Sequence, residues 1–209
     1  MHLGRLAGFS LSILLACSVA SGWAATAPSD DDQIMAKAAA WPGAKISETI
    51  DGDTKITTIE ISTVTITRRQ RGNSSEIEDY DNDRQGSVMC NFYMLANIHS
   101  WLKTCLDGQY PEFDTVLTES INKMTDFIVK NNLTPITKSD IQTEIDKINK
   151  KTHAYFLDKK TGNSCKTDQK ILALSSELKK ASASEISQLR EHVNRLLANP
   201  RPPAINPCL

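Results

Sequence analysis

The sequence predicts a mainly helical α+β fold, in which an N-terminal β-hairpin is followed by a bundle of about five helices and disulfides stabilise the domain. Three observations lead to this fold class. A run rich in Ile, Thr and Val follows an Asp51-Gly52 turn, which is typical of a hairpin. Apolar residues recur at helical spacing between residues 88 and 196, and four cysteines follow the N-terminal leader.

The leader, residues 1–24, is expected to be an export signal. Arg5 supplies a positive charge, and residues 6–20 are uncharged and dominated by Leu, Ala, Ile, Val and Phe. This run is shorter than the roughly 20 apolar residues of a membrane-spanning helix. The small residues Gly22 and Ala24 fit cleavage after residue 24, so the mature protein is expected to be periplasmic or secreted.

Cys17 offers an alternative to that cleavage. The preceding Leu14-Leu15-Ala16 resembles a bacterial lipobox, in which the cysteine is lipidated, although Leu15 departs from the small or β-branched residue that is common there. The alternative location is therefore a membrane-anchored lipoprotein. Contact with a membrane is expected only in that case.

Residues 25–87 form the first part of the predicted mature chain. Ser29 and the three aspartates after it predict a helix N-cap and an acidic first turn. Pro42 and Gly43 end this short helix. A β-hairpin and then a polar loop are expected to follow.

The hairpin is predicted from residues 44–69, with its turn at Asp51-Gly52. The alternation of apolar side chains changes phase near Ser62, which predicts a bulge or a second bend there. Residues 70–87 are polar and lack an apolar period, so a loop or linker is expected.

Residues 88–209 are expected to form a helical domain with a proline-rich tail. Residues 88–106 are apolar on two sides, which is typical of a central helix. Four more helices are predicted from apolar spacing and capping residues, beginning near Phe113, near Thr137 or Ser139, near Thr167, and at Ser182 with Glu185 as a capping box. The tail, residues 200–209, holds four prolines and cannot be helical.

The cysteines after the leader are Cys90, Cys105, Cys165 and Cys208, and an even number in an oxidising compartment predicts two disulfides. A single helix over residues 88–106 would separate Cys90 from Cys105 by about 22 Å, whereas the Cα atoms of a disulfide lie roughly 6 Å apart. Two pairings remain: Cys90 with Cys165 and Cys105 with Cys208, or Cys90 with Cys208 and Cys105 with Cys165. Either pairing straps the tail to the body.

Charge and motifs argue against several partners. Without Arg5 the chain has 23 basic and 25 acidic residues, a net charge of −2, so no bulk attraction to nucleic acid is expected. The basic cluster Arg68, Arg69 and Arg71 has no interleaved aromatic residues and is expected to protect a strand end. No CxxC occurs and the histidines show no ligand spacing to the cysteines, so neither a metal nor a cofactor is expected.

Asp79, Asp81 and Asp83 alternate as the first ligands of a calcium loop do. The glycine of that motif is replaced by Arg84, however, and its twelfth position is Cys90 instead of glutamate. A solvated acidic loop is therefore the expected structure.

His99 is the weak candidate for a catalytic residue. It lies among apolar residues of the predicted central helix, where a buried imidazole needs a hydrogen-bond partner, but the sequence names none. The chain contains no GxSxG, HExxH, P-loop or GxGxxG motif. We therefore expect a protein that is not an enzyme.

The expected function is an exported protein that binds another macromolecule, with a protein as partner, for example as an inhibitor, an immunity protein, or an accessory or envelope component. The β-branched run of residues 54–67 could offer a strand edge to such a partner, and so could the polar loop before residue 88. One alternative is a secreted enzyme of unknown reaction, with His99 close to Glu76, Glu78 or Asp79. The other is a lipidated structural surface protein whose hairpin pairs with copies of itself.

Overall fold

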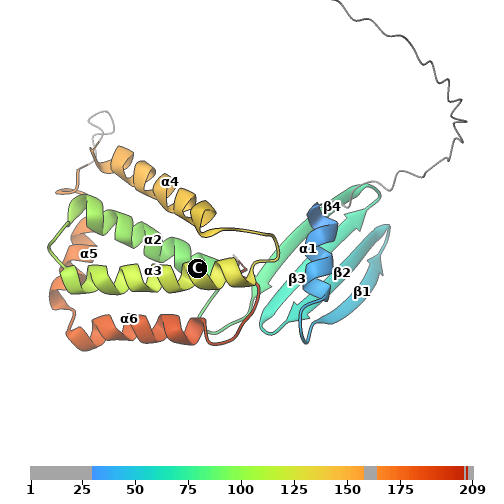
Figure 1. The fold of residues 1–209 in the computed structure, drawn as a ribbon. Coiled ribbons are helices and arrows are strands. Elements are labelled where there is room, and N and C mark those ends of the chain that lie inside the picture. The colour runs from blue at the N-terminus through green and yellow to red at the C-terminus, as the bar shows by residue number, and fades with distance from the viewer. Residues whose placement is uncertain (1–29, 158–163, 205, 207–209) are drawn as a thin grey trace, which may run out of the picture.

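The computed structural model describes residues 30–157, 164–204 and 206 (Figure 1). The predicted signal peptide, the alternative lipidation site Cys17 and the tail cysteine Cys208 lie outside these residues. Within the described part, the chain is mainly helical with one N-terminal sheet, as the sequence predicts. No helix in that part is both long and apolar enough to cross a membrane.

The N-terminal half contains a short helix and a four-stranded antiparallel sheet whose strands follow one another in sequence order. The elements are α1 (Asp30–Ala39), β1 (Lys45–Asp51), β2 (Thr54–Ile61), β3 (Val64–Arg71) and β4 (Ser74–Asp81). The predicted hairpin is therefore only part of a larger meander.

The C-terminal half contains the five helices that the sequence predicts. They are α2 (Val88–Cys105), α3 (Pro111–Asn131), α4 (Lys138–Leu157), α5 (Gln169–Lys180) and α6 (Ala183–Leu196). The capping box of Ser182 and Glu185 opens α6 as expected, whereas α5 is capped by Asp168 instead of Thr167.

The structure resolves the predicted irregularity near Ser62 and corrects the loop predicted over residues 70–87. The phase change near Ser62 is a tight turn between β2 and β3, in which Ser62 has a φ of 54°. This confirms the expected second bend. The prediction of a loop over residues 70–87 was wrong for residues 74–81, because β4 lies there and pairs with β3 along eight positions. Residues 72–73 and 82–87 are irregular, as expected.

One face of the sheet is covered by α1 and forms a small apolar core. Met35 and Ala38 of the helix pack with the side chains that the two central strands turn towards it, namely Ile59, Ile61, Val64 and Ile66. We call this face the inner face. The acidic residues Asp30, Asp31 and Asp32 lie in the first turn of α1. Their negative charges interact favourably with the positive end of the helix dipole and stabilise the helix.

A second, larger core lies among the helices. Phe92, Leu95 and Leu102 of α2 are buried there, together with side chains from all four of the other helices. In Figure 1, α2 lies between α3 and α4, so the prediction that this helix is central is confirmed.

A disulfide between Cys105 and Cys165, with Cα atoms 5.3 Å apart, ties the end of α2 to the segment before α5. This bond excludes the pairing of Cys90 with Cys165. Cys90 is also disulfide-bonded. The pairing of Cys90 with Cys208 stays a prediction, because Cys208 falls outside the described residues.

The start of the tail lies between the sheet and the helices. Residues 201–204 are all buried. Ala204 joins the core under α1 and accepts a hydrogen bond from the backbone N–H of Met89 at the start of α2. The carbonyl of Asn206 accepts a hydrogen bond from the backbone N–H of Asp81 at the end of β4. The tail therefore contacts both halves of the molecule.

Candidate functional site

The face of the sheet opposite α1 has no helix packed over it among the described residues, and we call it the outer face. Successive residues of a strand point to opposite faces, so the neighbours of the buried inner-face isoleucines point outwards. None of the side chains on the outer face is buried. They are Lys45, Ser47, Thr49, Asp51, Thr54, Ile56, Thr58, Glu60, Thr65, Thr67, Arg69, Arg71, Ser74, Glu76, Glu78 and Tyr80.

Short hydroxyl side chains occupy the middle of the outer face. The register places Thr58 opposite Ser47 on one side and opposite Thr67 on the other, so three hydroxyls cross three strands in one row. Each hydroxyl can donate one hydrogen bond and accept others. Such a row is polar and consists of short side chains, so a partner can contact it without first displacing a long side chain.

The three arginines on the outer face and around it are paired with carboxylates. Arg69 forms an ion pair with Glu78 on the neighbouring strand, and Arg71 binds Asp53 at 2.7 Å. Arg68 points to the inner face and binds Asp32 of α1. The basic cluster seen in the sequence is therefore divided between two faces, and each arginine has a carboxylate partner.

The edges of the sheet differ from the expected ones. Residues 54–67 form the two central strands instead of an edge, so that part of the prediction was wrong. The edges are β1 and β4, and all seven residues of β1 are exposed. Ile46 and Ile50 of β1 are 55% and 80% exposed, which leaves two large apolar side chains uncovered at this edge.

His99 lies on α2, where its half-buried side chain meets the start of α3. Its Nε2 atom is 3.2 Å from Oδ1 of Asp114 and 3.5 Å from the hydroxyl of Thr118. The other carboxylate oxygen of Asp114 is 2.7 Å from the ammonium group of Lys103. Asp114 is the partner that the sequence could not name.

Burial lowers the pKa of His99 below its usual value of 6.5, and the neighbouring charge of Asp114 opposes that shift without overcoming it. The hydrogen bond to Asp114 raises the pKa of Lys103. In a nucleophilic relay the carboxylate and the nucleophile bind different nitrogens of the imidazole. Here Asp114 and Thr118 approach the same nitrogen, so this contact lacks the relay geometry.

The carboxylates that the enzyme alternative grouped with His99 lie elsewhere. Glu76, Glu78 and Asp79 belong to β4, and Glu78 is bound to Arg69 within the sheet. In Figure 1, the half of α2 that carries His99 points away from the sheet. The structure does not bring these residues together.

His192 of α6 is a second histidine with a specific contact. Its Nε2 atom lies 3.2 Å from the side-chain oxygen of Asn91 on α2. Burial lowers its pKa, and the nearby charge of Arg195 acts in the same direction.

The acidic residues that resemble a calcium loop surround an arginine instead. Nε of Arg201 is 2.8 Å from Oδ2 of Asp81, and both side chains are fully buried. The guanidinium also lies 3.3 Å from a carboxylate oxygen of Asp83. Asp81 accepts a further hydrogen bond, at 2.7 Å, from the hydroxyl of Thr63. Two of the three aspartates therefore hold the tail, a role that no sequence motif indicates.

A cavity of about 140 Å³ lies where the inner face, α1, the tail and the loop after α3 meet. Most of its lining is apolar and includes Ile34, Ile66, Leu133 and Pro202. It opens on the inner side of the sheet and is separate from the outer face. In the described part of the chain, no three His, Cys, Asp or Glu side chains form a group that could hold a metal ion.

Comparison with known proteins identifies no relative: no family model, curated protein or solved structure matches the chain.

Proposed function

We propose that this chain is an exported protein that works by binding a protein partner through the outer face of its sheet. Export is supported by the leader sequence and by the disulfide between Cys105 and Cys165, because such bonds persist in oxidising compartments. Periplasmic or secreted location follows if the leader is cleaved after residue 24. Lipidation at Cys17 would instead place the same binding domain at a membrane surface.

The observation that carries the proposal is the open outer face. A one-sided antiparallel sheet commonly leaves one face to solvent, so exposure alone does not indicate a partner. Here, however, eight of the sixteen side chains on this face are Ser, Thr or Ile, and Tyr80 lies among them. Tyrosine is enriched in protein interfaces, and hydroxyl groups satisfy the polar groups of a partner.

Charge favours a protein over a nucleic acid as the partner. The expected mature chain has a net charge of −2, and Arg69 and Arg71 on the outer face are already bound to carboxylates. Nucleic acids are held mainly by cationic side chains that neutralise phosphates. A protein partner can instead match alternating charges and hydroxyls one by one.

Catalysis has weaker support. His99 was the candidate catalytic residue, and its contact with Asp114 lacks the geometry of a catalytic relay. A single ion-paired histidine more often serves stability than chemistry.

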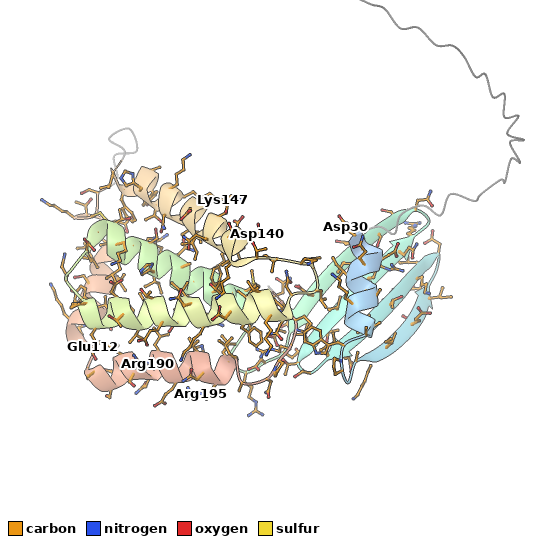
Figure 2. All side chains as sticks on the ribbon, in the orientation of Figure 1. Asp30, Glu112, Asp140, Lys147, Arg190 and Arg195 are labelled. Atoms are coloured by element: carbon orange, nitrogen blue, oxygen red, sulfur yellow. A yellow bond between two sulfur atoms is a disulfide. The ribbon has the colours of Figure 1, made fainter. Side chains whose placement is uncertain are left out.

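Photo-crosslinking in the native host tests the proposal. A benzophenone amino acid at Thr58, in the middle of the outer face, should crosslink one protein partner. The same group at Lys147 should not, because Lys147 projects from α4, away from the sheet (Figure 2). The purified partner should then bind the wild-type chain directly.

Affinity measurements with that partner supply the matched comparison. Thr58→Arg places a long charged side chain in the hydroxyl row and should weaken binding at least about tenfold, whereas Lys147→Glu should leave affinity unchanged. Equal crosslinking from both positions, or full affinity in the Thr58→Arg variant, would contradict the proposal.

A further inference from the structure

The edge strand β1 lacks several of the usual protections against pairing with another strand. Natural edges are blocked by proline, by bulges, by very short strands or by charged side chains. Of these devices β1 has only the charged side chains, namely Lys45, Glu48 and Asp51. β1 has seven residues, contains no proline, and pairs with β2 without interruption from Lys45–Glu60 to Asp51–Thr54. In Figure 1 it lies on the side of the sheet farthest from the helical bundle, so a second strand can approach it.

The sequence of β1 is complementary to itself when it is read in the antiparallel direction about Glu48. Lys45 then faces Asp51 of a second copy, Ile46 faces Ile50, and Ser47 faces Thr49. These pairs join opposite charges, apolar side chains and hydroxyls, which are the favourable cross-strand combinations. Each pair occurs twice, because a two-fold axis through Glu48 relates the copies.

The side chains at this edge are available for those pairs. Neither Lys45 nor Asp51 takes part in an ion pair among the described residues, and both are exposed. Ile46 and Ile50 point to the side of the sheet that α1 covers but lie beyond its cover. Pairing with a second copy would shield both isoleucines from water.

Glu48 would meet its own copy at the axis, where like charges disfavour pairing. Each carboxylate already has a counter-ion, because Lys55 of β2 lies 2.8 Å away, and the hydroxyl of Thr57 is within 3.4 Å. The hydrogen bond from Lys55 lowers the pKa of Glu48. The axis would therefore carry two carboxylates and two ammonium groups, without net charge.

We propose that two copies of this chain associate through β1 in antiparallel register centred on Glu48, so that the two sheets form one continuous sheet of eight strands. This interaction goes beyond the proposed function and does not depend on it, since it uses the edge and leaves the outer face open. It would place two outer faces side by side, and a partner with repeated sites would then bind with avidity.

The dimer is expected to be weak. One strand edge buries less than the roughly 1,600 Å² of a standard interface, so dissociation in the micromolar range is expected. Analytical ultracentrifugation of the purified exported chain between about 1 and about 500 µM should show a monomer–dimer equilibrium. A chain that stays monomeric over that range would overturn the proposal.

Charge reversal tests the register. Lys45→Asp and Asp51→Lys each bring like charges together twice per dimer, and each should raise the dissociation constant at least about tenfold. The double variant K45D/D51K restores opposite charges and should return to within about threefold of wild type. Lys147→Asp, on α4, is the control and should have no effect. If neither single charge reversal changed the dissociation constant, the dimer would have to use another surface, and the proposal would be wrong.

Crosslinking tests the axis directly. Glu48→Cys places a thiol opposite its own copy, so a short bismaleimide should link two chains. Glu76→Cys, on the opposite edge strand β4, is the matched control and should give little product. The proposal fails if Glu76→Cys crosslinks as efficiently as Glu48→Cys. Far-ultraviolet circular dichroism confirms that each variant is folded.

Discussion

At the scale of single residues, the buried pair of Arg201 and Asp81 is the contact that the sequence was least able to reveal. The two residues are 120 positions apart, and an arginine in a proline-rich tail resembles a solvated one. The guanidinium also donates to the carbonyls of Leu196 and Asn199, so it joins the end of α6 to the end of β4. Only the folded structure brings these groups together.

Arg201→Met should destabilise the protein by about 3–5 kcal/mol, because the carboxylate of Asp81 would stay buried without a counter-charge. Urea unfolding measures this free energy. Arg190→Met removes an exposed ion pair with Glu119 and should cost under about 1 kcal/mol. Similar costs for the two variants would contradict the role given to Arg201.

His99 and His192 make stability depend on pH. Their pKa values are lowered by burial, so the unfolded chain takes up protons near pH 6.5 while the folded chain does so only at lower pH. Acidification therefore favours the unfolded state, and stability should fall as the pH drops from about 6.5. Asp114 faces His99, and Arg195 and Asp83 lie near His192.

The pH effect is checked by measuring unfolding free energy between pH 7.5 and pH 5.5, about one unit on either side of the usual histidine pKa. The variant His99→Gln/His192→Gln should show a smaller fall than wild type. His153→Gln, at an exposed position, should behave as wild type does. An unchanged slope in the double variant would mean that other groups control this pH range.

At the scale of elements, the helices were predictable and one strand was not. α3 buries residues at spacings of three and four, and that period is visible in the sequence. β4 buries only Asp81, so no alternation of apolar residues marks it. Because Ile77 is the only apolar side chain that this edge strand packs against the core, its pairing with β3 depends mainly on the backbone and the turn at Gly72.

The disulfide between Cys105 and Cys165 stabilises the arrangement of α2 and α5. It closes a loop of 60 residues, so Cys105→Ser/Cys165→Ser should lower the unfolding free energy by about 4 kcal/mol in the chain-entropy model. Denaturant unfolding without a reducing agent measures the loss. Unchanged stability in the double serine variant would contradict the bond.

At the scale of the whole molecule, two apolar cores are joined by the start of the tail. One core lies under α1, the other among the helices, and residues 201–204 contact both sides of the junction. The sequence indicated the helical bundle and a β part, but it could not indicate which face of the sheet stays open. That depends on where α1 and the tail pack after folding.

In Figure 1, α1 lies on one face of the sheet and the helical bundle lies beside the sheet. The other face, the outer face, carries exposed or partly exposed side chains, most of them polar. The central claim is that this surface binds a protein partner. Thr58 and Thr67, on neighbouring strands, report on the outer face, and Asp114 reports on the bundle. A comparison of the two sites on binding is the most direct way to locate the partner.

Chemical-shift mapping by NMR of the mature chain, titrated with the crosslinked partner, makes this comparison residue by residue. We expect the largest perturbations at Thr58 and Thr67 and none around His99 and Asp114. Perturbations confined to the helical bundle, with the outer face unchanged, would contradict the account.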